Sequence, residues 1–232
     1  MKKFIIEKSF WDLFPDAKIG VLVLKGIQSQ ESNDEIINLL AQANLEAKKY
    51  LVAELVSENK EVAVWRKAYQ KFKTKKGARC SIEALLKRIN SGKGVSTINA
   101  LVDIYNAASL KYALPCGAED IDKFKGDLRL TISAGGDKFI GIGEDDLDET
   151  LAGELCYLDD DGAVCRCFNW RDGIRTMIDD NTKSAFVVME VIDNRLDDLH
   201  KALAFIKNNS EKYLGAVVDV HILDLDHQEI NL

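Results

Sequence analysis

Apolar and polar residues follow two different patterns along this chain of 232 residues. In the first half, apolar residues recur every three or four positions, which is typical of amphipathic helices. Ile36, Leu40 and Ala43 illustrate this spacing, and Ser32 or Asn33 can cap the helix that contains them. The pattern predicts helices over residues 34–57, 60–73, 81–89 and 97–110.

The second half contains short apolar runs separated by Gly and Asp turns, as in antiparallel sheets. These runs predict strands over residues 128–132, 138–141, 155–158, 164–168 and 185–189. Asp159-Asp-Asp-Gly162 is a strong hairpin signal. Further strands are expected at the N-terminus, over 19–24 and over 217–223, with a helix over 194–208. We therefore expect an α+β fold for 1–232, a single compact domain of mostly antiparallel β layers with N-terminal helices packed against them.

Charge is unevenly distributed along the chain. The net charge of −7 argues against a general nucleic-acid coat, yet the segment from Arg66 to Arg79 holds seven basic residues and no acid. Residues 144–161 hold nine acids and no base. Such a chain can bind a phosphate backbone on one side and repel it on the other, or the lysines can simply be solvated. The candidate RNA-binding residues are Lys67, Lys71, Lys73, Lys75 and Lys76.

Several function classes find no support in the sequence. No apolar run reaches the roughly 18 residues of a membrane helix, and the N-terminus does not read as a signal peptide. The five cysteines are an odd number, which fits reduced thiols in the cytoplasm. Cys165-x-Cys167 is poor zinc spacing, the three histidines all lie in the last 33 residues, and no nucleotide-binding motif is present. We expect no metal and no cofactor.

Two stretches carry candidate chemistry. Asn99, Asp103 and Asn106 would share one face of a helix, where they either line a polar cavity or tie the helix to neighbouring backbone. Arg166-Cys-Phe-Asn-Trp-Arg-Asp-Gly-Ile-Arg-Thr176 packs three arginines and an indole into eleven residues. If this stretch is a strand, Arg166, Phe168 and Trp170 point one way and Cys165, Cys167, Asn169 and Arg171 the other. Such a set can clamp carboxylates or phosphates, or brace a turn.

The sequence also resembles a known family. One motif is similar to the B3/B4 domain of the phenylalanyl-tRNA synthetase β-subunit. It is Asn99-x-Leu-Val-Asp-x-x-Asn106, followed by Leu110, Pro115 and Asp120. The run from Thr182 to Glu190 resembles a strand of that family. The resemblance is strongest over 79–194 and is closest to free-standing B3/B4 proteins, which share the Arg166–Arg171 and Arg175-Thr176 motifs.

In the synthetase this domain hydrolyses mischarged aminoacyl-tRNA, so the resemblance implies a tRNA-binding protein that deacylates in trans without a metal, through an oriented water. The catalytic candidates are Asp103, Asn169 and Arg175. The substrate-binding candidates are Arg79, Ser81, Glu83, Asn99, Asn106, Trp170, Arg171 and Thr176.

The family's histidine and glutamate are replaced here by Gly117 and Ile174, so its specificity does not carry over. A binding module for a free amino acid and an inert regulatory relative remain open as alternatives. The expected partners are the aminoacylated end of tRNA or a small amino-acid ligand, with neither membrane nor DNA.

Overall fold

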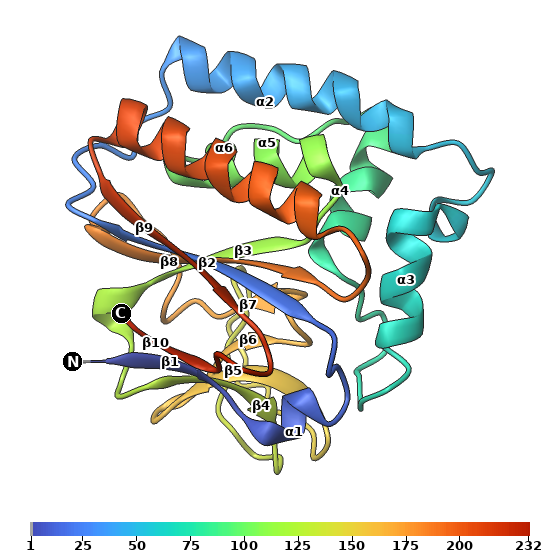
Figure 1. Cartoon of the computed structure of the whole chain (residues 1–232), viewed down its shortest axis with the longest axis vertical. Coiled ribbons are helices and arrows are strands. Elements are labelled where there is room, and N and C mark those ends of the chain that lie inside the picture. Colours follow the sequence, from blue (N-terminus) through green and yellow to red (C-terminus); the bar gives the residue numbers. More distant parts are fainter. Residues whose placement is uncertain (1) are drawn as a thin grey trace.

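Three layers make up the part of the chain that the computed structural model describes, residues 2–232. A layer of helices covers the outer face of a four-stranded sheet, and a six-stranded sheet lies against the other face (Figure 1). The strand orders are β3-β8-β2-β9 and β10-β1-β4-β5-β6-β7. All pairings are antiparallel except that between β1 and β4.

The helices are α1 (Lys8–Trp11), α2 (Asp34–Glu46), α3 (Lys60–Ala68), α4 (Ser81–Asn90), α5 (Ala100–Tyr112) and α6 (Leu196–Leu214), with 3-10 turns at Ala47–Tyr50, Val56–Glu58 and Ile121–Lys123. The strands are β1 (Lys3–Ile6), β2 (Lys18–Lys25), β3 (Cys116–Asp120), β4 (Leu128–Ile132), β5 (Leu155–Asp159), β6 (Gly162–Arg166), β7 (Arg171–Asp172), β8 (Ser184–Val191), β9 (Val217–Leu223) and β10 (Glu229–Asn231).

The apolar run of β2 is explained by its place between two cores. Ile19, Val21 and Val23 pack into the core between the sheets, whereas Leu22 and Leu24 pack under the helices. A strand that is buried on both faces needs apolar residues at successive positions, not at alternate ones. The near-continuous run thus marks the middle of the molecule.

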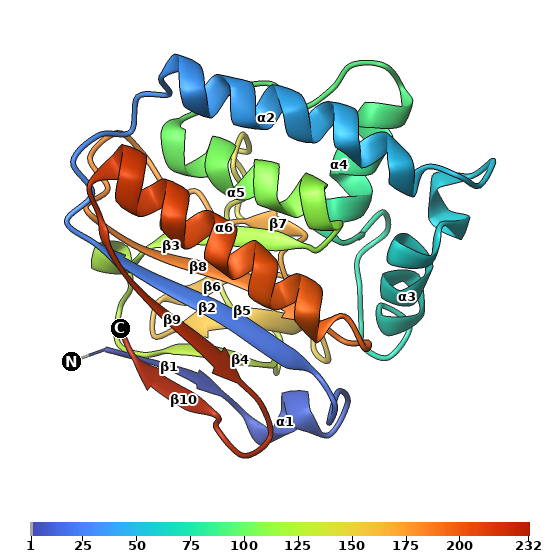
Figure 2. The same ribbon diagram turned by 45° about the horizontal axis from the view of Figure 1, so that its top comes forward.

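Helix α6 lies close against the four-stranded sheet (Figure 2). A Cβ atom on Gly20 would lie 2.8 Å from a methyl of Leu203 and 2.9 Å from one of Leu199. Glycine at this position lets the helix approach the strand. Helix α5 packs beside α6, and α2 covers α5.

The predicted α+β class with mostly antiparallel layers is confirmed. Strands β4 and β9 have the predicted ends, and β5 and β6 form the predicted hairpin around Asp160. The helical layer includes the C-terminal helix α6 as well as the N-terminal helices.

The helix predicted over 34–57 is too long, because α2 ends at Glu46. The Asn59 side chain accepts hydrogen bonds from the N–H groups of Val52 and Ala53, both at 2.9 Å, and donates to the carbonyl of Val56 at 3.1 Å. These bonds fold the chain around Asn59, so the segment turns away from the helical path.

Two other expected elements also differ. The helix predicted over 60–73 ends at Ala68, and Lys73 instead donates its backbone N–H to Gly153 at 2.8 Å. Residues 138–141 form no strand. Their backbone groups bond to several separate segments, including Ala163 and Ile174, so no continuous ladder develops.

Candidate acidic pocket between the sheets

A narrow cavity of about 10 Å³ lies between the two sheets. Its walls come from β3, β4, β5, β6 and β8 and from the segment that leads from β6 into β7. The polar side chains that line it belong to acids, amides, a phenol and a thiol: Glu119, Asp172, Asn169, Tyr157 and Cys165. No lysine or arginine is among the described lining residues.

Glu119 reaches the cavity from β3. The strand is held on one side by β8 and on the other by a hydrogen bond of 2.8 Å from the Asp120 N–H to the Thr176 carbonyl. The Glu119 carboxyl group is buried beside the hydroxyl of Thr176. Burial raises the pKa of Glu119 well above its usual value, and the charge of Asp172 raises it further.

Asp172 lies on the opposite wall, at the end of β7. One of its oxygens accepts a hydrogen bond of 3.0 Å from the Cys165 thiol, and the residue remains partly exposed. Burial of the carboxyl group raises the pKa of Asp172 to about 6. Gly117 keeps this region open, since a Cβ atom there would lie 3.1 Å from the Asn169 Cβ.

A third acid, Glu190, lies behind the lining residues Tyr157 and Asn169. It accepts hydrogen bonds from the Tyr157 hydroxyl at 2.7 Å and from the Asn169 amide, and the Asn169 carbonyl oxygen accepts one from Ser81 at 2.7 Å. Burial raises the pKa of Glu190 to about 8. This chain of hydrogen bonds fixes Asn169 in the wall of the cavity.

Tyr105 approaches the same group of acids from α5. Burial raises the pKa of its phenol well above the usual value, and the nearby Asp172 and Glu119 raise it further. The hydroxyl therefore keeps its proton at neutral pH and can donate a hydrogen bond.

An unusual turn brings Asn169 to the cavity. The predicted strand over 164–168 ends at Arg166, because Cys167 and Phe168 have φ angles of 51° and 59° in the left-handed region. Phe168 turns into a cluster of aromatic rings, and the Tyr69 hydroxyl donates to the Cys167 carbonyl at 2.6 Å. The predicted alternation of side chains from Arg166 to Arg171 is therefore wrong.

The expected Asn99, Asp103 and Asn106 stripe does not line this cavity. Asn99 caps α5 by accepting a hydrogen bond from the Val102 N–H, and Asn106 is half-buried elsewhere on α5. Asp103 accepts hydrogen bonds from the Ile98 N–H at 2.8 Å and from the Ser32 hydroxyl at 2.5 Å. Since Asp103 braces backbone, we no longer assign it a catalytic role.

The two arginines expected at the site form ion pairs with acids. Both terminal nitrogens of Arg175 bind Asp159, at 2.7 and 2.8 Å. Arg171 pairs with Glu144 at 2.8 Å and lies over the Trp170 ring. Neither pairs with Asp103, so the expected grouping of Asp103 with Arg171 or Arg175 is wrong.

The remaining substrate candidates are divided between two places. Ser81 contacts Asn169, and the buried Thr176 hydroxyl lies beside Glu119. Glu83 pairs instead with Arg66 and Lys87, and Arg79 donates to the Gly77 carbonyl. Asn169, Ser81 and Thr176 are thus the predicted residues that meet at the cavity.

The basic segment is exposed at Lys67, Lys71, Lys73 and Lys76, whereas Lys75 pairs with Asp148. The acidic stretch therefore lies beside the basic one, contrary to the expected separation on opposite sides.

Sequence reasoning missed the three acids because they come from strands far apart in the chain. A local signal existed at Glu119, an acid that directly follows the small and apolar residues Cys116-Gly-Ala118 of β3. Within residues 2–232, no group of three or more His, Cys, Asp or Glu side chains is arranged to hold a metal, and no helix is long and apolar enough to cross a membrane.

Comparisons with known proteins agree with this architecture. An N-terminal fragment of the phenylalanyl-tRNA synthetase β-subunit from Pyrococcus horikoshii superimposes with a TM-score of 0.52 at 9% sequence identity. The alignment covers 93% of this chain and 49% of that one, so the chain spans about half the length of its structural relative. No curated protein sequence matches. The sequence model of the B3/4 domain matches residues 64–224, and the chain therefore belongs to the B3/4 domain family.

Proposed function

We propose that this protein binds the aminoacyl end of a tRNA and hydrolyses its ester bond in trans. The observation that carries the proposal is a cluster of acids between the sheets of a B3/4 domain, in which Asp172 is the one residue that remains partly exposed.

Asp172 is the proposed general base. A carboxylate with a pKa of about 6 is ionised at neutral pH and still basic enough to accept a proton from water. The water oxygen would bond to the ester carbonyl carbon, and its proton would pass to Asp172. The ribose oxygen would then leave with that proton, which restores the carboxylate.

Tyr105 and Asn169 are assigned supporting roles. The protonated Tyr105 hydroxyl would donate to the developing oxyanion, as donors of this kind do in other acyl transfers. The Asn169 amide is bound to Glu190, so Asn169 serves as a positioning residue for the cavity wall.

The test is single-turnover hydrolysis, with tRNAs charged in separate reactions with each proteinogenic amino acid. We expect Asp172→Asn to slow the reaction by about 10²–10⁴, the usual contribution of a general base. The exposed residues Glu149 and His200 supply matched controls, and Glu149→Gln and His200→Ala should retain the wild-type rate. Hydrolysis of no charged tRNA, or an unchanged rate in Asp172→Asn, contradicts the proposal.

The second candidate is a binding module for a free amino acid. The net charge of −7 favours it, because this charge disfavours RNA overall. Saturable binding of an amino acid without hydrolysis of any charged tRNA would support this alternative.

A further inference from the structure

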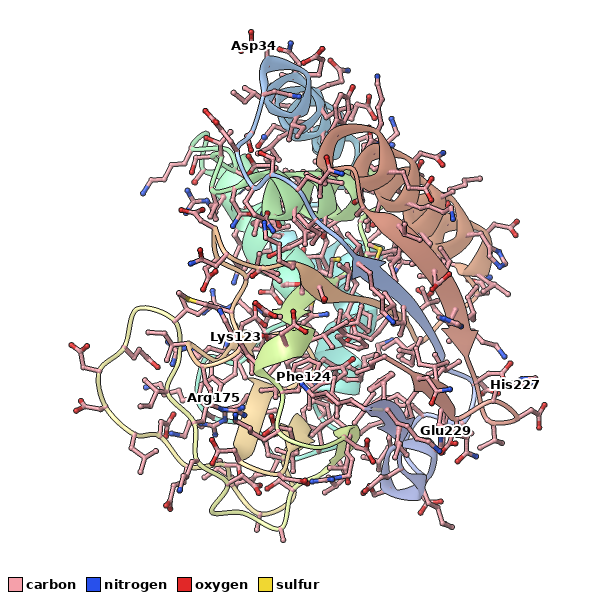
Figure 3. The ribbon with its side chains drawn as sticks, turned by 90° about the vertical axis from the view of Figure 1, so that its left-hand side faces the viewer. Asp34, Lys123, Phe124, Arg175, His227 and Glu229 are labelled. Carbon is pink, nitrogen blue, oxygen red and sulfur yellow. The ribbon has the colours of Figure 1, made fainter. Side chains whose placement is uncertain are left out.

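Strand β9 forms an open edge of the four-stranded sheet. It pairs with β2 on one side, and within residues 2–232 no strand pairs with it on the other. Figure 3 shows β9 at the rim of the molecule, leading to the turn that holds the labelled His227. The opposite edge of the same sheet is covered, because the Asp120 N–H of β3 donates to the Thr176 carbonyl. An uncovered edge strand is a template for pairing with another chain.

The free backbone groups of β9 are those of Val218, Val220 and Ile222. One row of the sheet shows this, since four residues lie opposite one another in it: Asp120, Ala185, Leu24 and Val218. A residue in an antiparallel sheet directs its N–H and its C=O to the same side. Since Asp120 bonds away from β8, the Ala185 groups point to β2 and bond to Leu24. The Val218 groups therefore point outward, and so do those of Val220 and Ile222.

We propose that two copies of this chain associate through β9, antiparallel and about a two-fold axis at Val220, so that one sheet runs through both copies. In this register Val220 pairs with its own copy and Val218 pairs with Ile222. Each pair exchanges two hydrogen bonds, so every outward backbone group of the three residues gains a partner. This association does not depend on the proposed deacylase activity.

The charged and polar side chains of β9 favour the same register. It places Asp219 of one copy opposite His221 of the other, in a pair whose side chains lie close together. The carboxylate accepts a hydrogen bond and the imidazole has an N–H to donate. A shift of two residues in either direction would instead place Asp219 opposite Asp219 or His221 opposite His221. Like charges directly opposite each other are unfavourable, so the edge is complementary to itself in one register.

The association would also cover exposed apolar side chains. Val217 is 70% exposed and Val220 is 39% exposed. In the proposed register Val220 lies against its own copy at the axis, and Val217 lies opposite Leu223. Removal of apolar surface from water favours the paired state.

Lys207 opposes this pairing in the single chain. Its amino group donates to the outward Val218 carbonyl at 2.8 Å and lies 3.1 Å from Glu211, one turn further along α6. A lysine over an edge strand is a common obstacle to pairing. The ammonium must leave the carbonyl when the copies associate, and Glu211 then remains as its partner. Asp219 and Lys207 thus supply variants with opposite expected effects.

Sedimentation equilibrium of the full chain at several concentrations tests the proposal. We expect the wild type to show a monomer–dimer equilibrium. Asp219→Lys should weaken the dimer about tenfold or more, because the two-fold axis repeats the change in two cross-strand pairs. The double variant Asp219→His with His221→Asp keeps the pair and should restore the wild-type affinity. Lys207→Met should strengthen the dimer, because it removes the competing donor.

Glu149→Lys is the matched control, since Glu149 is exposed outside β9 and undergoes the same change of charge. It should leave the dimer unchanged. Because Asp219 is also exposed, Asp219→Lys should fold, and the wild-type measurement stands without it.

Hydrogen exchange locates the contact. The amides of Val218, Val220 and Ile222 should become more protected as the wild-type concentration rises. A chain that stays monomeric at every concentration overturns the proposal. A dimer that Asp219→Lys leaves intact, or one that does not protect these three amides, would be formed by another surface and would overturn it as well.

Discussion

Single residues in this protein show two ways of burying an acid. Asp159 lies beside Arg175, and Glu83 beside Arg66, so these acids are neutralised by cations. Glu190 has only neutral donors, and burial is the largest cause of its raised pKa. The two arrangements predict opposite effects on stability. Removing the cation of an ion pair should destabilise the protein, whereas replacing Glu190 with a neutral residue should stabilise it as the pH rises.

We expect Glu190→Gln to become progressively more stable than the wild type as the pH rises from about 4 to about 8. Because folding raises the pKa of Glu190 from about 4.3 to about 8, the folded protein binds the extra proton and stability falls as pH rises between these values. Glutamine mimics the protonated acid and removes this fall. Each unit of pKa corresponds to about 1.4 kcal/mol.

Urea unfolding at several pH values in this range measures the effect, with Glu149→Gln as the control. A constant difference in unfolding free energy between Glu190→Gln and the wild type would show that Glu190 does not titrate in this range.

Arg175→Ala should destabilise the protein by about 3 kcal/mol, because it leaves the buried Asp159 carboxylate without its counter-ion. Arg129→Ala is the matched control, since Arg129 pairs with the exposed Asp160 and such surface pairs contribute about 0–1 kcal/mol. Chemical denaturation compares the two variants. Equal losses of stability would mean that the pair with Asp159 has no special structural role.

Whole elements depend on bonds that connect distant segments. Helix α5 begins where Asp103 ties the Ile98 N–H to the Ser32 hydroxyl, which joins the start of α5 to the segment before α2. This arrangement favours the structural interpretation of the Asn99 and Asp103 motif over the pocket interpretation.

Asp103→Asn should therefore lower the free energy of unfolding by about 1–2 kcal/mol. The amide oxygen can still accept a hydrogen bond from the Ile98 N–H, but the amide nitrogen cannot accept one from the Ser32 hydroxyl. Ligand binding and any hydrolysis should be unchanged. Ser32→Ala serves as the control, because it removes the same hydroxyl bond and leaves the Ile98 bond intact. Thermal unfolding and single-turnover hydrolysis of charged tRNA measure the two properties, and slower hydrolysis by Asp103→Asn would return this residue to the pocket.

Local sequence predicted elements whose environment is uniform along their length. Strands β4 and β9 and helix α5 have one periodicity throughout, so pattern alone located them. The turn at Cys167 and Phe168 was not predictable, because it depends on aromatic partners from α1 and α3 and the loop after α3. The cluster of acids was missed for a similar reason. Its acids come from β3, β7 and β8, and they lie close together only when the sheets pack against each other.

At the scale of the whole molecule, the basic segment lies next to the cavity despite the overall negative charge. Its Tyr69 bonds to the Cys167 carbonyl, and the chain continues to Ser81, which contacts Asn169. Acids of residues 144–161 are largely engaged in internal pairs, such as that of Asp148 with Arg166 and Lys75. The exposed lysines of this segment are therefore the contacts that the proposed function assigns to RNA phosphates.

We expect the combined change of Lys67, Lys71, Lys73 and Lys76 to Glu to weaken tRNA binding and reduce its dependence on salt. Each phosphate contact that is lost should lower the slope of log affinity against log salt by about 0.7–0.9. Lys75 is left out because its pair with Asp148 makes it structural. Filter binding at several salt concentrations measures the slope, and Lys201→Glu on the exposed side of α6 controls for net charge. If the four-fold variant and the wild type give the same affinity and slope, this segment does not bind tRNA. Weaker binding with an unchanged slope would likewise count against phosphate contacts, because lost counterion release must appear in the salt dependence.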